Sequence, residues 1–383
     1  MTAGGCTHII FRHIIWSSHP LAIIRRNWNF MNIQENVPLA QYTTFKIGGN
    51  ARFFCIVKNG DELKDVIGFA KKNILPYFVL GGGSNILVSD KGFMGMVIKM
   101  EIQGKSIDDT MINDQVMISA GAGEMWDDFV EYTVDQGFNG LENLSAIPGT
   151  VGAAPVQNIG AYGAEVGQFI YSVHALDTQT MKEIEISGHD CHFGYRNSLF
   201  KKEKGRYIVV SVNFLLKKDG KVNTEYKDLK EYFLKKNDQL SIINNQITPA
   251  QVREAVINIR WNKLPDWNLW GTAGSFFKNP VISQAHFDEI KVKYPGLPGF
   301  PEASNTGGHE DLVKIPLGWV LDNVCKVKGI MRGGVGTYEK QALVIVAKAG
   351  ATAGEVVAFT QDLMKQVKDA TGITIEAEVE WVN

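Results

Sequence analysis

Closely spaced cysteines are missing from this sequence of 383 residues. The four cysteines, Cys6, Cys55, Cys191 and Cys325, lie far apart in the chain and form no CxxC motif. This spacing suggests neither a disulfide framework nor a zinc site. We therefore expect no metal site and a protein of the reducing cytoplasm.

An excess of basic charge and a long apolar run are missing as well. Lysine and arginine total 39 against 41 aspartates and glutamates, which gives a net charge of −2. This balance offers no broad basic surface for nucleic acid or for an anionic membrane. No stretch supplies the ~18 consecutive apolar residues of a membrane span. These absences favour a small-molecule ligand.

Acidic residues are absent from residues 1–30, which contain Arg12, Arg25, Arg26 and three of the eight histidines. Charged and polar side chains interrupt the apolar residues of this segment, which makes it a poor signal-peptide core. We interpret Met31 as the natural start and residues 1–30 as a disordered or non-native extension. A targeting peptide is the alternative.

The rest of the chain mixes helical and strand patterns, which predicts an α+β fold of two or three domains of ~100–150 residues. Apolar residues at helical spacing predict five helices, at residues 61–73, 124–136, 249–264, 312–324 and 355–371. Short apolar runs predict strands at residues 76–80, 86–88, 96–98 and 342–347, and strand-like runs fill 173–216. The segment 217–246, rich in lysine and asparagine, is interpreted as a solvated excursion.

The last residues of the chain alternate between apolar and polar side chains. Alternate residues of a strand share a face, so Glu376, Glu378 and Glu380 line up opposite an apolar row. The pattern by itself favours a row of carboxylates that faces solvent. The alternative places one of these carboxylates at a cleft.

Two loops rich in small residues are candidate ligand sites. Residues 81–85, with the sequence GGGSN, follow a predicted strand, and glycines there let backbone N–H groups approach a pyrophosphate. This loop lacks the GxGxxG order of a Rossmann fold. Residues 147–163 form an uncharged loop with many backbone donors, which suits a flat cofactor. Either loop alone has a structural alternative, a turn or a packed linker, but together they favour a dinucleotide.

An ordered set of motifs resembles the UDP-N-acetylenolpyruvoylglucosamine reductase family, in its first structural type. The motifs are TTFKIGG at residues 43–49, GGGSN at 81–85, GLENL at 140–144, FGYR at 193–196, KLP at 263–265, GSFFKNP at 274–280 and EAEV at 376–379. Each motif is weak alone, but the ordered set is specific. The similarity runs from Tyr42 to the end of the chain.

This resemblance implies a two-domain FAD-binding module of the vanillyl-alcohol-oxidase kind and a third, α+β substrate-binding domain. The first FAD-binding domain is expected at residues 31–100 with 373–383, the second at 101–264 and the substrate-binding domain at 265–372. FAD is expected to bind non-covalently, which agrees with the absence of histidine from both loops. The residues expected to bind it are Gly81, Gly82, Gly83, Ser84, Asn85, Ile147, Pro148, Gly149, Ala153, Val156 and Gly160.

The family reaction is the NADPH-dependent reduction of UDP-N-acetylglucosamine enolpyruvate to UDP-N-acetylmuramate in peptidoglycan precursor synthesis. By resemblance, hydride passes from NADPH to FAD and then to C3 of the enolpyruvyl group, while negative charge develops at C2 and its carboxylate. Arg196 is expected to stabilise this charge and Ser275 to protonate C2. Glu376 is the third expected catalytic residue: protonated it donates a hydrogen bond to the developing enolate, and ionised it orients Arg196 or a water. Ala377 stands where the family usually has proline.

The diphosphate and nucleotide of the substrate need cations and hydrogen-bond donors. The residues that match the family here are Tyr162, Tyr226, Lys263, Asn279 and Gln341, each with an ordinary structural hydrogen bond as its alternative role. We expect a monomer that binds neither nucleic acid nor membrane. The rival functions are an FAD-dependent oxidase of a small alcohol or sugar and a non-catalytic protein that binds a nucleotide sugar.

Overall fold

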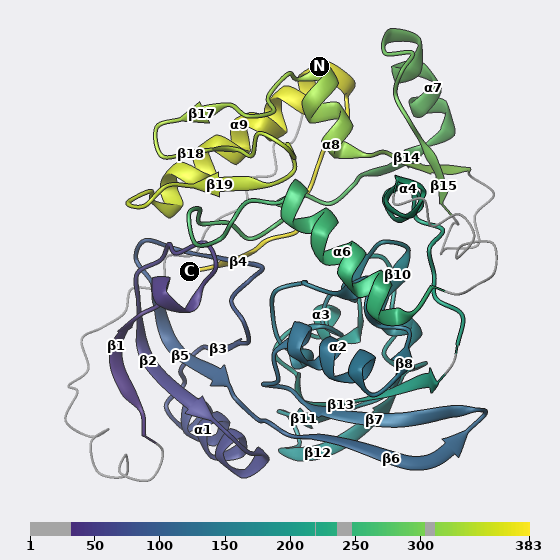
Figure 1. The fold of residues 1–383 in the computed structure, drawn as a ribbon. Coiled ribbons are helices and arrows are strands. Elements are labelled where there is room, and N and C mark those ends of the chain that lie inside the picture. The colour runs from purple at the N-terminus through teal and green to yellow at the C-terminus, as the bar shows by residue number, and fades with distance from the viewer. Residues whose placement is uncertain (1–31, 219, 236–246, 303–310) are drawn as a thin grey trace, which may run out of the picture.

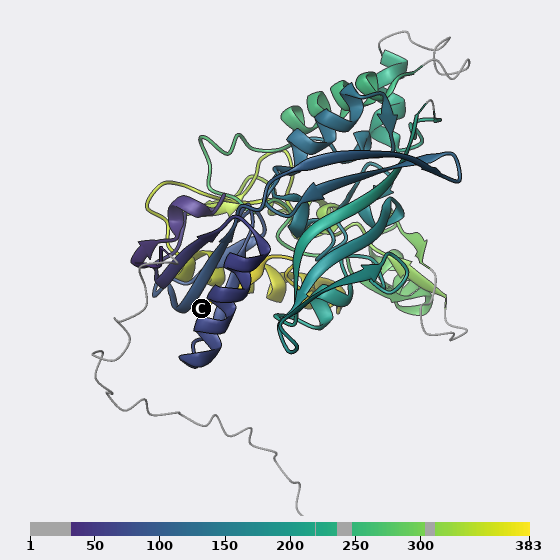
Figure 2. The same ribbon diagram turned by 90° about the horizontal axis from the view of Figure 1, so that it is seen from below.

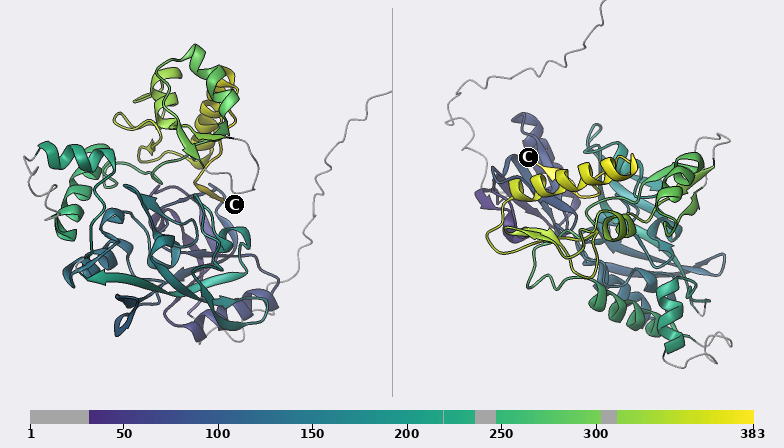
Figure 3. Two further views of the ribbon diagram at one scale, coloured as in Figure 1. Left: turned by 90° about the vertical axis from the view of Figure 1, so that its right-hand side faces the viewer. Right: turned by 90° about the horizontal axis from the view of Figure 1, so that it is seen from above.

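The computed structural model describes residues 32–218, 220–235, 247–302 and 311–383 (Figure 1). The predicted extension at residues 1–30 lies outside the described residues. Residues 236–246, which belong to the excursion predicted at 217–246, lie outside them as well. The elements form three groups, two of which are built on large sheets and lie below the third in Figure 1. Figure 3 shows the same division from the side, with the third group above the others. The predicted α+β class is confirmed.

The first group is a four-stranded sheet in the order β1-β2-β5-β3, with one helix beside it (Figure 2). Strands β2, β5 and β3 run parallel, whereas β1 is antiparallel to β2. The elements are β1 (Gln34–Pro38), β2 (Asn50–Val57), α1 (Gly60–Lys72), β3 (Tyr77–Leu80), β4 (Ile86–Val88) and β5 (Phe93–Met100). The predicted helix at 61–73 and the strands at 76–80, 86–88 and 96–98 are confirmed.

Helix α1 begins where its sequence supplies a cap. The side chain of Asn59 accepts a hydrogen bond from the Glu62 N–H at 2.9 Å, which satisfies a donor at the start of the helix. The apolar residues at helical spacing, from Leu63 to Ala70, are buried against the sheet.

The second group is an antiparallel sheet in the order β12-β11-β13-β7-β6, with β8 paired to β13. Trp126 and Phe129 of α2 pack on Phe214 of β13, with ring centroids 6.1 and 5.0 Å apart. The strands are β6 (Lys105–Ile112), β7 (Gln115–Gly121), β8 (Phe138–Asn139), β9 (Gly160–Ala161), β10 (Ala164–Glu165), β11 (Ile170–Asp177), β12 (Lys182–Ser187) and β13 (Tyr207–Lys218). The helices are α2 (Trp126–Asp135), α3 (Leu199–Lys202), α4 (Lys227–Lys235) and α6 (Pro249–Lys263).

Helix α6 begins with the capping signals that its sequence predicts. The Thr248 hydroxyl accepts a hydrogen bond from the Gln251 N–H at 3.3 Å, and the Gln251 side chain accepts one from the Thr248 N–H at 2.8 Å. Pro249 occupies the first turn, where a missing N–H costs nothing. The predicted helix is therefore confirmed, and its apolar stripe is buried.

The third group contains two small sheets, in the orders β14-β16-β15 and β17-β18-β19. Its elements are β14 (Val281–Ser283), α7 (Gln284–Lys293), β15 (Phe300–Glu302), β16 (Leu312–Lys314), α8 (Leu317–Trp319), β17 (Met331–Arg332), β18 (Val335–Thr337), β19 (Ile345–Ala347) and α9 (Ala353–Thr371). The predicted helix at 355–371 is confirmed, and Gly372 ends it with a φ of +74°. The helix predicted at 312–324 is confirmed only from Leu317, where α8 continues into a π-helix at Val320–Val324. Its predicted start at 312 is wrong, because Pro316 disfavours helical structure before Leu317 and residues 312–314 form β16.

The chain ends by returning to the first group. Strand β20 (Glu380–Val382) runs parallel to β4, while Ile373 and Ile375 just before it are buried in the core of the third group. A large apolar core is shared by the first two groups, since it contains both Phe53 of β2 and Ile118 of β7. The predicted domain limits at 100, 264 and 372 stay an interpretation.

Candidate active site

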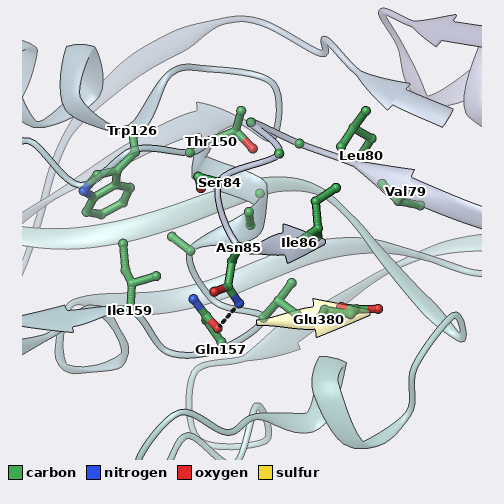
Figure 4. A pocket seen from close by; sticks show the side chains of 18 of the residues that line it. Val79, Leu80, Ser84, Asn85, Ile86, Trp126, Thr150, Gln157, Ile159 and Glu380 are labelled. Atoms are coloured by element: carbon green, nitrogen blue, oxygen red, sulfur yellow. Dashed lines mark hydrogen bonds between the residues drawn. The ribbon is translucent and has the colours of Figure 1, made fainter. Parts of the chain in front are cut away.

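A pocket of about 400 Å³ lies where the three groups of elements meet. Its volume is in the range typical of small-molecule sites. The wall combines the β3–β4 loop, the loop at 147–161 and the chain around α3 with the segment 273–275 and two residues of the C-terminus. Figure 4 shows the part of the wall formed by the two glycine-rich loops and the end of the chain.

The two glycine-rich loops touch each other through their backbones. A Cβ atom on Gly82 would lie 2.7 Å from Cα of Gly149, and one on Gly81 would lie 2.6 Å from the Thr150 hydroxyl oxygen. Such distances leave no room for a side chain at either glycine. The loops therefore form a closely packed cradle of glycine backbone at the pocket wall, a type of surface whose N–H groups can bind an anion.

Side-chain hydrogen bonds fix the same two loops together. The Ser84 hydroxyl donates to the Pro148 carbonyl at 2.9 Å, and the Asn85 amide donates to Gln157 at 2.9 Å (Figure 4). The Thr150 hydroxyl is buried, lines the pocket and has no hydrogen-bond partner within the described residues. A buried polar group without a partner at a pocket wall fits a ligand that supplies the partner.

The structure brings together all of the residues predicted to bind FAD. These residues line the pocket: Gly81, Gly82, Gly83, Ser84, Asn85, Ile147, Pro148, Gly149, Ala153, Val156 and Gly160.

Arg196 reaches the pocket from a tight turn before α3. Two backbone hydrogen bonds between Gly194 and Asn197, of 3.1 and 3.0 Å, close this turn and place Arg196 at its tip with a φ of +51°. The guanidinium donates to the Gly160 carbonyl at 3.1 Å, and its Nε lies 2.8 Å from a carboxylate oxygen of Glu378. Arg196 is thus held by both the uncharged loop and the C-terminal segment.

Glu378 is the carboxylate at the pocket wall nearest to Arg196. Its side chain is only 10% exposed. Burial raises the pKa of Glu378 above its ordinary value, although the positive charges of Arg196, Lys201 and Lys278 act in the opposite direction. A carboxyl group in this position can serve as a hydrogen-bond donor when protonated.

Glu376, expected at the cleft, lies outside the pocket wall. Its side chain is 73% exposed and pairs with Lys278 at 3.0 Å. A β-bridge between Phe277 and Ala377 fixes the register of this segment. Glu376 and Glu378 stand on either side of Ala377, and two residues of extended chain span about 6.6 Å. The expected position of Glu376 is therefore corrected, since Glu378 is the residue that reaches the pocket.

Ser275 lines the pocket together with its neighbours Ala273 and Gly274. Its backbone forms a bridge with Val344, and the next residue, Phe276, donates to the Leu343 carbonyl at 2.8 Å. Phe276 and Phe277 are buried in the core of the third group, while Ser275 itself is exposed. The same Phe276 accepts the Glu378 N–H at 2.8 Å. Ser275 and Glu378 are therefore fixed to one piece of backbone.

Comparisons with known proteins identify the family. Residues 51–182 match the model of an FAD binding domain, and residues 265–382 match that of the UDP-N-acetylenolpyruvoylglucosamine reductase C-terminal domain. The UDP-N-acetylenolpyruvoylglucosamine reductase of Neisseria gonorrhoeae is 41% identical over 352 residues, which cover 91% of this chain and 97% of that protein. This chain belongs to the UDP-N-acetylenolpyruvoylglucosamine reductase family.

A further comparison agrees with this membership, and a solved structure agrees with the fold. The reductase of Bdellovibrio bacteriovorus is 40% identical over 355 residues, which cover 92% of this chain and 100% of that protein. The crystal structure of the reductase from Thermus caldophilus has a TM-score of 0.62 at 24% identity and covers 92% of this chain and 100% of its own. The predicted family and the FAD-binding module with a further C-terminal domain are confirmed.

The residues expected to bind the reductase substrate lie outside the wall of this pocket. Tyr162 and Tyr226 contact each other edge to face, with ring centroids 5.4 Å apart. Lys263, at the end of α6, pairs with Asp228 at 2.6 Å. These three predicted residues thus form a group near the α4–α6 pair.

The two remaining predicted substrate residues have structural hydrogen bonds in the third group. Asn279 accepts the N–H of Leu317 at 2.9 Å and so caps the start of α8. Gln341 accepts the N–H of Leu343 at 3.4 Å. The structure does not bring Asn279 and Gln341 to the pocket wall.

Three cationic residues of the pocket wall, Lys201, Lys204 and Arg260, were missed by sequence reasoning. Arg260 lines the pocket, and its Nε donates to the Ala146 carbonyl at 3.1 Å. Burial lowers the pKa of Arg260, with neighbouring Tyr162 acting in the opposite direction. Residues four apart lie on the same face of a helix, so the position of Arg260 four residues after the buried Val256 could have indicated that it faces inward. Lys201 also lines the pocket, and no local pattern marks it.

Within the part of the chain that the structure describes, no helix has the length and apolar character of a membrane span. The same residues contain no group of histidine, cysteine and carboxylate side chains that could hold a metal ion.

Proposed function

We propose that this chain is an NADPH-dependent flavoenzyme that reduces UDP-N-acetylglucosamine enolpyruvate to UDP-N-acetylmuramate in peptidoglycan precursor synthesis. The observation that carries the proposal is that Arg196, Ser275 and Glu378 line the same pocket as the two glycine-rich loops. Membership of the reductase family supports the same reaction. A cytoplasmic location and a monomeric state stay predictions.

The pocket fits non-covalent FAD. The cradle of Gly81, Gly82 and Gly149 has the backbone donors and the close approach that a diphosphate needs, and the Thr150 hydroxyl is a donor without a partner among the described residues. The residues that line the pocket include no histidine, the side chain through which related flavoproteins attach the cofactor. Bound FAD supplies hydride transfer from NADPH to C3 of the enolpyruvyl group.

Arg196 is proposed to stabilise the negative charge that develops at C2 and the substrate carboxylate. A guanidinium can address a carboxylate through two parallel hydrogen bonds. The contacts of Arg196 with Gly160 and Glu378 orient it before substrate arrives, so little reorganisation accompanies the reaction.

Ser275 is proposed to protonate C2. Its O–H bond breaks as the new C2–H bond forms, and a solvent proton restores the hydroxyl group. Glu378 takes the role that the sequence had suggested for Glu376: in its protonated form it donates a hydrogen bond to the developing enolate. The raised pKa of Glu378 supports this protonated form, because burial disfavours its charge.

The nucleotide and diphosphate of the substrate are proposed to bind next to these residues. Arg260 supplies a half-buried positive charge at the wall of the pocket, and Tyr162 lies beside it. Burial raises the pKa of Tyr162 to about 12, so its hydroxyl group stays a hydrogen-bond donor at neutral pH. Tyr226, Lys263, Asn279 and Gln341 stay predicted substrate ligands.

An anaerobic visible spectrum of the purified protein tests the proposal. We expect a yellow protein that is bleached by NADPH and regains its colour when UDP-N-acetylglucosamine enolpyruvate is added. A protein that bleaches but recovers only with oxygen would instead indicate the oxidase. A colourless protein that cannot take up FAD would contradict any flavoenzyme and favour a nucleotide-sugar-binding protein.

A further inference from the structure

The backbone of Arg196 has a conformation that its own side chain disfavours. Its φ of +51° lies in the left-handed region, which suits glycine or asparagine and is strained for arginine. Such a conformation persists only where neighbouring groups hold it. A contact that holds the backbone carbonyl of Arg196 therefore also helps to fix the position of its guanidinium.

Lys201 provides such a contact. Its ammonium group donates to the Arg196 carbonyl at 3.1 Å, and its side chain lines the pocket. Its own backbone is fixed, because its N–H donates to the capping Ser198 hydroxyl at 3.3 Å. That hydroxyl in turn donates to the Val156 carbonyl at 2.5 Å, so the start of α3 is tied to the uncharged loop.

Lys201 also lies among the charges of the pocket. The charged groups that face it are Arg196, Lys278, Glu378 and Glu380. Burial lowers the pKa of Lys201, and the nearby Lys278 adds to this effect, whereas Glu378 and Glu380 oppose it. Its positive charge in turn acts against the burial that raises the pKa of Glu378.

We propose that Lys201 is a positioning residue of the reductase: its ammonium group holds the strained turn of Arg196 in place and supplies a fixed positive charge beside Glu378. The proposal rests on the proposed function, because Arg196 and Glu378 act on the enolpyruvyl group. It assigns to Lys201 no contact with the reacting atoms.

Lys201→Met removes the donor and the charge at similar size, and Lys202→Met is the matched control because Lys202 is exposed and absent from the pocket wall. With FAD bound, we expect Lys201→Met to be reduced by NADPH at the wild-type rate. Reoxidation of its flavin by UDP-N-acetylglucosamine enolpyruvate should be about 100-fold slower, because the guanidinium is misplaced. Lys202→Met should match wild type in both half-reactions.

The pH profile of reoxidation separates positioning from a general loss of structure. Lys201→Met should shift the pH profile to higher pH, because the loss of a positive neighbour raises the pKa of Glu378 further. If Lys201→Met fails to hold FAD, then Lys201→Gln, which keeps a donor but no charge, is measured instead. The same upward shift in Lys201→Gln supports the proposal.

Wild-type rates and an unshifted profile in these Lys201 variants would overturn the role of Lys201 and leave the proposed function intact. Failure of the wild-type enzyme itself to be reoxidised by the enolpyruvyl sugar would overturn the proposed function, and the role of Lys201 with it.

Discussion

Two glutamates of the C-terminal segment, separated by one residue, have opposite surroundings. Glu378 is 10% exposed and lies 2.8 Å from Arg196 at the pocket, whereas Glu376 is 73% exposed and lies 3.0 Å from Lys278. The path of the backbone after these residues explains the difference in exposure. After Glu378 the chain bends at Val379 and enters β20 beside β4, which carries the segment along the pocket wall.

The chemical role of an ion pair in this segment depends on how deeply the pair is buried. An exposed pair is solvated and contributes little, while a buried carboxyl group is shifted in its proton affinity and is available for chemistry. Register along the segment therefore decides which glutamate reaches the pocket, although the two side chains are identical.

The largest effect is expected from a change at Ser275, whose neighbour Phe276 accepts a backbone hydrogen bond from Glu378. Ser275→Ala should keep bound FAD and its reduction by NADPH, but slow reoxidation by the enolpyruvyl sugar by about 10²–10⁴-fold, because the proton donor is lost. Anaerobic stopped-flow spectroscopy of the two half-reactions measures both rates. Unchanged reoxidation would exclude Ser275 as the proton donor.

A smaller effect is expected in the pH dependence of stability. A carboxyl group whose pKa is raised in the folded state contributes stability below its ordinary pKa of 4.5 and loses it as pH rises through the folded value. Glu378→Gln lacks this loss, so its melting temperature should rise relative to wild type as the pH increases from about 4 to 8.

Thermal unfolding followed by circular dichroism at each pH measures this difference, with Glu376→Gln as the variant at the outer position. A melting temperature of Glu378→Gln that falls relative to wild type over the same range would show that Glu378 is stabilised as a carboxylate, contrary to the surroundings described above.

The smallest effect is expected from breaking the outer pair. Glu376→Gln should lower the free energy of unfolding by less than about 1 kcal/mol, because exposed ion pairs are screened by solvent. Urea unfolding of the variant and wild type checks this. A loss of several kcal/mol would mean that the Lys278–Glu376 contact is a structural element and would weaken the comparison.

Local signals in the sequence predicted much of the fold. Helix α6 follows from Thr248 and Pro249 at its start, and α9 ends at Gly372, because caps and helix stops depend on neighbouring residues alone. The pairing of β20 with β4 joins segments about 290 residues apart, and no local pattern specifies such a partner.

The site was predicted less evenly than the fold. The glycine-rich loops, Arg196 and Ser275 belong to motifs of the family, and the structure places them at one pocket. Alternation put Glu376 and Glu378 on the same face, so it could not select the one that reaches the pocket. Arg260 was missed since a charged residue near the end of a helix is usually solvated.

Reoxidation of the NADPH-reduced flavin in Glu378→Gln and Glu376→Gln, measured side by side under anaerobic conditions with UDP-N-acetylglucosamine enolpyruvate, tests the central claim most directly. Glu378→Gln should be slower than wild type by about 10²–10³-fold, while Glu376→Gln should react at the wild-type rate. A slow Glu376→Gln beside a normal Glu378→Gln would contradict the assignment of the pocket carboxylate.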